Sequence, residues 1–172
     1  MAWSSRRTPN PARICLITPA KPVSRNGNRM TAARWARFLR QLGHEVLLEQ
    51  TWGGEESDVM ISLDARRSHL SLKGYATAYP ERPLVVVLTG TDLYRDIRSD
   101  EAAKESLELA TALILLQEKG VEELEPRHRS KARVIYQSAE PVRRLPPSKE
   151  HFDVCVIGHL RAEKDPFRAA LP

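Results

Sequence analysis

The sequence has 172 residues, which is enough for one well-buried α/β core but too few for two complete domains of that kind. Hydrophobic residues make up 41%, and this fraction and the regular spacing of apolar runs argue against disorder over most of the length. The charged fraction of 28% predicts a highly solvated surface. No apolar run reaches membrane-spanning length, and no apolar segment follows the arginines near the N-terminus. We therefore expect neither a signal sequence nor a membrane span, and we expect a cytoplasmic location.

The formal net charge of +5 suits nucleic acid, and it equally suits small anionic substrates such as sugar nucleotides. The arginine pairs are scattered and lack interleaved aromatic residues, which argues against a dedicated nucleic-acid surface. Cys15 and Cys155 stand in no C-x-x-C or C-x-x-H pattern. We expect both to be reduced core residues, and we expect no metal and no cofactor.

Short apolar runs alternate with amphipathic segments along the chain. The expected strands are residues 13–18, 45–50, 58–63, 84–89, 112–116 and 132–137, and the expected helices are residues 29–42, 66–79, 100–110 and 118–124. In the first helix an apolar stripe precedes a terminating Gly43, the stripe being Ala32, Trp35, Ala36, Leu39 and Leu42. Strands and helices that alternate at this spacing predict an α/β fold with a Rossmann-like, doubly wound parallel sheet.

The composition also predicts how the chain is divided. Residues 1–12 form a polar, flexible N-terminus, and residues 13–138 form the Rossmann-like domain. Residues 139–152 change to Pro, Arg, Ser, Lys and Glu, which is typical of an interdomain linker. Residues 153–158 then predict a new buried strand, so we expect residues 153–172 to be the truncated start of a second α/β domain.

Asn26, Gly27 and Asn28 lie between the first expected strand and the first expected helix. A glycine there lets the backbone approach a ligand closely, and a helix N-terminus offers free N–H groups and partial positive charge to a phosphate. The segment lacks G-x-G-x-x-G, so a dinucleotide site is not supported. Asn and Gly are also ordinary loop residues.

Asp64, Arg66, Arg67 and His69 follow the third expected strand. Two arginines can clamp an anionic group, and a histidine can shuttle a proton near neutral pH. Asp64 could orient a hydroxyl of a ligand. The alternatives are that Asp64 caps the following helix and that His69 is a surface or packing residue.

Thr91 and Asp92 lie in the turn after the most apolar strand. Parallel sheets bind ligands outside the carboxyl ends of their strands, so this turn points toward the expected cleft. The alternative is an Asp helix cap with Gly90 easing the turn.

Farther along the sequence, Arg161 and Lys164 follow an expected strand and a turn. This position suits stabilisation of a diphosphate leaving group, and the alternative is an ordinary charged surface loop.

In this order the segments resemble GT-B glycosyltransferases with family-4-like organisation, and among these most closely the selenosugar synthases of selenoneine biosynthesis. The stretches that carry the resemblance are residues 21–29, 64–68, 88–96, 134–139 and 158–166. The resemblance implies an N-terminal domain that binds the acceptor and a C-terminal domain that holds a UDP-sugar. It also implies metal-free transfer of the sugar from UDP-N-acetylglucosamine or UDP-glucose to selenophosphate.

Roles for individual residues follow from the same resemblance. The expected catalytic residues are Asp92 and His69. The residues expected to bind the acceptor are Arg25, Asp64, Arg66, Arg67 and Thr91. The residues expected to bind the donor diphosphate are Asn26, Gly27, Asn28, Arg161 and Lys164. Related enzymes often carry a histidine near the position of Asp64. The rest of a donor-binding domain is missing, so the chain is expected to be an incomplete fragment that is inactive alone. The alternatives are a hydroxyl acceptor and a non-catalytic ligand-binding domain.

Overall fold

The computed structural model describes residues 10–24, 26–139, 141, 146, 149–152, 154–156, 165, 167 and 168. The chain divides into two units, Met1–Ser138 and Ala139–Pro172. The first unit contains all the strands that are described, and its fold positions the candidate site.

Six parallel strands form one sheet in the first unit. They are β1 (Arg13–Ile17), β2 (Glu45–Glu49), β3 (Val59–Leu63), β4 (Leu84–Leu88), β5 (Ala112–Leu115) and β6 (Ala132–Val134), in the order β2-β1-β3-β4-β5-β6. The predicted Rossmann-like, doubly wound sheet is thus confirmed, with strands slightly shorter than expected. Central strands such as β4 are apolar at every position because both faces of the sheet are packed.

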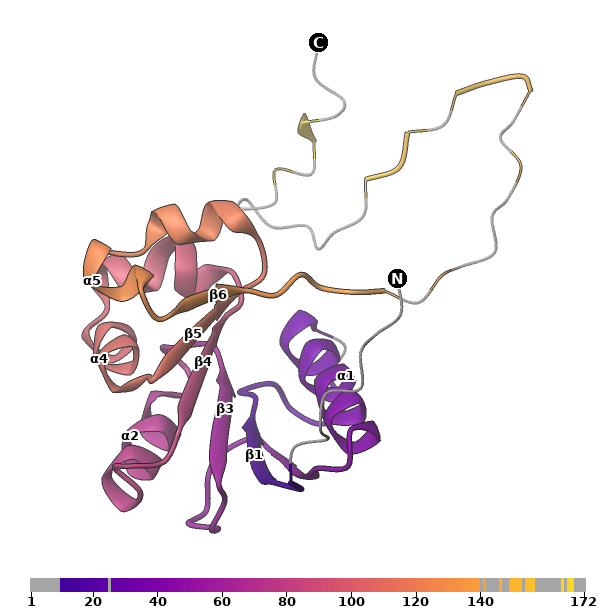
Figure 1. The fold of residues 1–172 in the computed structure, drawn as a ribbon. Helices are drawn as coiled ribbons and strands as arrows, with labels where there is room; N and C mark the ends of the chain where they lie inside the picture. The colour runs from indigo at the N-terminus through magenta and orange to yellow at the C-terminus, as the bar shows by residue number, and fades with distance from the viewer. Residues whose placement is uncertain are drawn as a thin grey trace. The chain divides into compact units, whose positions relative to one another are not determined.

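Helices cover the two faces unequally. The helical elements are α1 (Gly27–Gln41), α2 (His69–Ala78), the π-helix η1 (Asp92–Asp96), α3 (Ile97–Ser99), α4 (Glu101–Leu109), the 3₁₀ helix η2 (Glu118–Glu123) and α5 (Pro126–Arg129). The connection from β1 to β2 runs in one direction across the sheet, and those from β3 through β5 run in the other. Right-handed crossovers therefore put α1 on one face and α2 and α4 on the opposite face (Figure 1).

Each face has its own hydrophobic core. Ile14 and Leu16 of β1 point toward α1, where they join Ala32 and Ala36. The alternate β1 residues join the larger cluster that packs under α2 and α4, so Cys15 is a buried free thiol as expected. Leu42 departs from the predicted stripe: it is 65% exposed because it is the C-cap residue, and Gly43 follows with a φ of 91°.

Two expected helices differ from the prediction, one in its first residue and the other in its helix type. The helix expected from residue 66 starts at His69, because Asp64 has a left-handed φ of 71° and its side chain accepts a hydrogen bond from the Arg67 N–H. Residues 118–123 form a 3₁₀ helix rather than an α-helix. The short helices η1, α3 and α5 were not predicted, because each is shorter than the periodicity that reveals a helix in a sequence.

The expected strand at residues 153–158 is wrong for the three of its residues that the structure describes. Residues 154–156 have no strand geometry; Val154 is 69% and Val156 55% exposed, and Cys155 is exposed rather than a core thiol. A strand that is buried on both faces needs neighbouring strands and covering helices. These three residues pair with no strand in the described part of the chain.

Across the described ranges, none of the helices combines the length and apolar character that a membrane span requires.

The turn after β4 depends on a glycine. Gly90 has a φ of 149°, and a Cβ built there would meet no atom within 4 Å, so the cost of Gly90→Ala is purely conformational. We expect Gly90→Ala to lower the free energy of unfolding by roughly 1–3 kcal/mol in urea denaturation. Gly27→Ala is the matched control, because Gly27 opens α1 and its Cβ position is equally unobstructed. Gly27→Ala should be as stable as the wild type or more so, and equal losses in both variants would contradict a conformational requirement specific to Gly90.

Candidate functional site

The turns after β1, β3 and β4 leave the same edge of the sheet. These three strands are adjacent and parallel, so the turns that follow them lie at one edge. The strand order changes direction between β1 and β3. In open α/β sheets, ligands bind outside the carboxyl ends of the strands at such a switch point, so this edge is the candidate site.

Asp92, the first residue of η1, ties two of these turns together. Its Oδ2 accepts a hydrogen bond from the Ala65 N–H at 3.1 Å, in the turn after β3. Its Oδ1 accepts from the N–H groups of Thr89 and Gly90 at 3.0 and 2.9 Å, in the turn after β4. Asp92 is 1% exposed, and burial raises its pKa while these backbone hydrogen bonds act to lower it. Its carboxyl group therefore fixes the relative positions of the two turns.

Asp64 directly follows β3 and is also buried. Its Oδ1 accepts from the Arg67 N–H at 2.9 Å, and its Oδ2 lies 4.0 Å from the Arg67 guanidinium. Burial first, and then the negative charge of Asp92, raises the pKa of Asp64 to about 6, against an ordinary 3.8. Asp64 is thus a carboxyl group that exchanges its proton close to neutral pH.

Asp96, the last residue of η1, completes this group of acids. It is 6% exposed, and its Oδ2 accepts from Arg66 Nε while its Oδ1 accepts from Arg95 Nε, both at 2.9 Å. The π-helical turn buries Asp92 and Asp96 and leaves Tyr94 and Arg95 exposed. Arg95 and Asp96 were not among the site residues predicted from the sequence; the D-x-x-x-D spacing after the β4 turn was the available signal.

The N-terminus of α1 is the third part of this edge. Asn26 is the N-cap, and its Oδ1 accepts from the Arg29 N–H at 3.0 Å. Gly27 is exposed with no atom near its Cβ position, and Asn28 is half-buried. The Asn26 cap occupies the Arg29 N–H, which leaves the N–H groups of Gly27 and Asn28 in this first turn to receive a phosphate.

Thr18 is a further residue of this edge that was not predicted from the sequence. It follows β1 directly, is fully buried, and its hydroxyl has no hydrogen-bond partner among the described residues. A buried hydroxyl without a partner is uncommon and costs stability. The only available signal was its position at the end of an apolar strand.

Residues 135–138 lead from β6 toward α1 (Figure 1). The Ile135 N–H donates to the Leu115 carbonyl, and farther on Gln137 Nε2 donates to Thr31 Oγ1 at 3.0 Å. Arg34 Nε of α1 donates to Ser138 Oγ at 3.1 Å. Because β6 ends and α1 begins at the same edge of a parallel sheet, this segment follows that edge.

His69 lies at the contact between α2 and α4. Its Nδ1 is 3.0 Å from Ser106 Oγ, and its Nε2 is 3.0 Å from Glu105. Both ring nitrogens therefore have partners on α4, and the structure does not bring the imidazole to the carboxyl group of Asp92. This geometry favours the packing alternative, and the catalytic role of His69 stays a prediction.

The remaining predicted residues fall into two groups. Thr91, Arg66 and Arg67 are exposed at the candidate edge. Arg25, Arg161 and Lys164 lie outside the described residues, so their assignments stay predictions.

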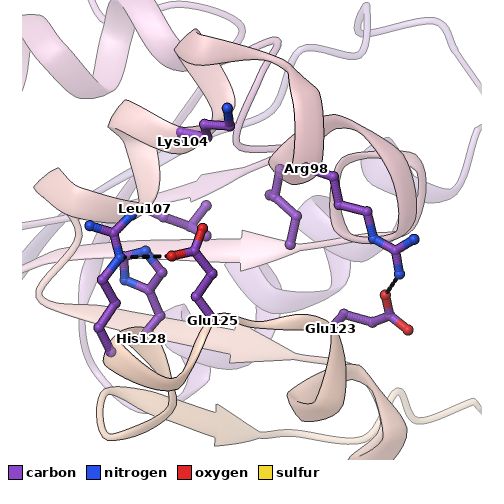
Figure 2. A pocket seen from close by; sticks show the side chains of 8 residues that line it. Arg98, Lys104, Leu107, Glu123, Glu125 and His128 are labelled. Atoms are coloured by element: carbon purple, nitrogen blue, oxygen red, sulfur yellow. Dashed lines mark hydrogen bonds and ion pairs between the residues drawn. The ribbon is translucent and has the colours of Figure 1, made fainter.

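A separate small cavity lies beside α4 (Figure 2). It is lined by Ile97, Arg98, Lys104, Leu107, Glu123, Glu125, Arg127 and His128. Its volume of about 60 Å³ is far below the roughly 300–1,000 Å³ of small-molecule sites. The arginines at its rim are already paired, Arg98 with Glu123 (Figure 2) and Arg127 with Glu125. We assign no ligand to this cavity.

Within the described ranges, no group of three or more His, Cys, Asp or Glu side chains has the arrangement to hold a metal ion. In comparisons with known proteins, no family model matches the chain, and no curated sequence matches it.

The raised pKa of Asp64 makes stability depend on pH. The folded chain holds this proton more tightly than the unfolded chain, so the stabilisation is present below the ordinary pKa of 3.8 and is lost as pH rises through about 6. In the Asp64→Asn variant the asparagine side chain cannot ionise, but it retains an oxygen that accepts a hydrogen bond from the Arg67 N–H. Asparagine also tolerates the left-handed backbone at this position. We expect this variant to gain up to roughly 3 kcal/mol relative to the wild type between about pH 4 and pH 7.5, measured by urea denaturation.

Asp64→Ala is the control for the backbone at this position. Alanine lacks the acceptor oxygen, and its left-handed conformation costs roughly 1–2 kcal/mol, so this variant should be less stable than Asp64→Asn at either pH. A stability difference between Asp64→Asn and the wild type that stays constant across this pH range would contradict the assigned pKa shift.

Proposed function

We propose that the first unit is the acceptor-side domain of a GT-B-type glycosyltransferase. The reaction is transfer of a sugar from UDP-N-acetylglucosamine or UDP-glucose to selenophosphate, in the cytoplasm. The observation that carries the proposal is that exposed Arg66 and Arg67 stand at the same sheet edge as the start of α1, beside the topological switch point. Cations and free helix N–H groups at one edge suit two anionic reactants, an acceptor and a nucleotide diphosphate.

The proposed step is a displacement at the anomeric carbon. Selenium of selenophosphate forms a bond to this carbon as the bond to the β-phosphate oxygen breaks, and UDP departs with that electron pair. A selenium nucleophile is largely ionised and polarisable, so little base catalysis is required. Positioning of the reactants and stabilisation of the leaving group then dominate.

This mechanism assigns different work to the residues of the site. Arg66 and Arg67, with Arg25, hold the acceptor anion, while Asp64 and Thr91 shape its pocket. Asn26, Gly27 and Asn28 face the donor diphosphate, and Arg161 and Lys164 neutralise the departing UDP. The buried, fully hydrogen-bonded carboxyl group of Asp92 supports this division, because it secures the turns that carry the acceptor residues.

Anion binding by the 172-residue chain tests the proposal directly. Anaerobic ³¹P NMR titration with selenophosphate should show saturable binding, and Arg67→Gln should weaken it about tenfold through loss of a charge-assisted contact. Arg13→Gln is the matched control, because Arg13 opens β1 at the opposite edge and pairs with Glu45. It should bind selenophosphate as the wild type does.

Two outcomes would contradict this proposal. The first is the absence of selenophosphate binding, or a loss that is equal in Arg67→Gln and Arg13→Gln. The second is tight binding of UDP-N-acetylglucosamine to this chain, because a GT-B enzyme holds its nucleotide sugar mainly on the other domain. A parallel titration with a neutral sugar alcohol tests for an acceptor that reacts through a hydroxyl group.

A further inference from the structure

Asp96 holds two arginines from different parts of the chain. Arg66 comes from the turn after β3 and Arg95 from η1 after β4, and each donates its Nε–H to a separate oxygen of Asp96 at 2.9 Å. The Asp96 side chain is 8% exposed, whereas those of Arg66 and Arg95 are 43% and 60% exposed. One buried carboxylate thus anchors two guanidinium groups that reach the surface.

Contact through Nε constrains how a guanidinium group is presented. The group is planar with five N–H donors, so fixing Nε on a carboxylate orients the terminal amino groups of the same plane. For Arg66, these terminal amino groups make no hydrogen bond in the described part of the chain. Its remaining donors are therefore oriented and available to a ligand.

The charges around Asp96 favour an anion. Three guanidinium groups are exposed at this edge, those of Arg66, Arg67 and Arg95. The three neighbouring carboxyl groups, those of Asp64, Asp92 and Asp96, are buried. The nearby carboxyl group of Asp92 is satisfied by the backbone N–H groups of the two turns. The negative charge of this edge therefore lies below the surface, and the positive charge lies at the surface.

We propose that Asp96 is a positioning residue and that Arg66 and Arg95 together bind a compact oxyanion such as a phosphate group at the carboxyl edge of the sheet. This inference rests on the proposed function, in which that oxyanion is the acceptor. It adds Arg95 as a second binding residue and Asp96 as the residue that fixes the pair. The hydrogen bonds of Asp92 to the turns after β3 and β4 fix the relative positions of the two segments that carry these arginines.

Asp96→Asn separates positioning from simple electrostatics. Removing a negative charge beside an anion site would by itself strengthen anion binding, whereas loss of the anchor weakens it. Isothermal titration of the 172-residue chain with inorganic phosphate should show about tenfold weaker binding for Arg66→Gln, for Arg95→Gln and for Asp96→Asn. Asp96→Glu keeps two acceptor oxygens and should recover part of the affinity.

Arg98→Gln is the matched control. Arg98 lies on the neighbouring α3 and pairs with Glu123, so this substitution removes the same charge from a nearby position without touching Asp96. Its phosphate affinity should equal that of the wild type. Thermal unfolding and circular dichroism of each variant establish that the titrated protein is folded, and titrations below the unfolding transition compare folded protein only.

The outcomes separate this inference from the proposed function. The positioning role of Asp96 is overturned if the Asp96→Asn variant binds phosphate as tightly as the wild type or more tightly. The paired site is overturned if the Arg95→Gln variant binds phosphate with wild-type affinity. If selenophosphate binding depends on Arg67 but not on Arg95 or Asp96, the proposed function stands and this inference fails. If phosphate binding depends on Arg66, Arg95 and Asp96 while selenophosphate does not compete for it, the anion site stands and the proposed acceptor fails.

Discussion

The hydrogen bonds of the buried Asp92 carboxyl group hold the candidate site together. They satisfy backbone N–H groups from two turns that are distant in sequence, Ala65 after β3 and Thr89 and Gly90 after β4. The same Ala65 residue accepts a hydrogen bond at its carbonyl from Ser106 of α4 at 2.7 Å. The turn after β3 is therefore held by hydrogen bonds from both η1 and α4. The backbone that carries the exposed arginines after this turn is fixed in place.

Departures from ideal backbone geometry gather at this edge of the sheet. Asp64 has a left-handed φ of 71°, Gly90 has a φ of 149°, and residues 92–96 form a π-helix. Left-handed non-glycine residues and π-helical turns are each costly or rare, and both occur disproportionately at functional sites. They bring acids and arginines together, which supports a binding role for this edge.

Most of the fold could be predicted from the sequence, but much of the site could not. Continuous apolar runs such as Leu84–Leu88 identify buried parallel strands, and the intervening amphipathic segments identify α1 and α4. The roles of Asp96 and Arg95 escaped prediction because they depend on a π-helical turn and on a partner, Arg66, 30 positions away. His69 looked like a proton shuttle in the sequence, yet packing places it between α2 and α4.

By itself the sequence determined the six strands of the sheet, the doubly wound class and the edge at which polar turns gather. The physical reason is that hydrophobic periodicity and turn residues are local, and parallel strands align their carboxyl ends without further information. The tertiary structure decided which polar side chains meet. It buried Asp64, Asp92 and Asp96, paired Asp96 with two arginines and turned His69 toward α4, because contacts between distant segments depend on register and helix packing that no local pattern encodes.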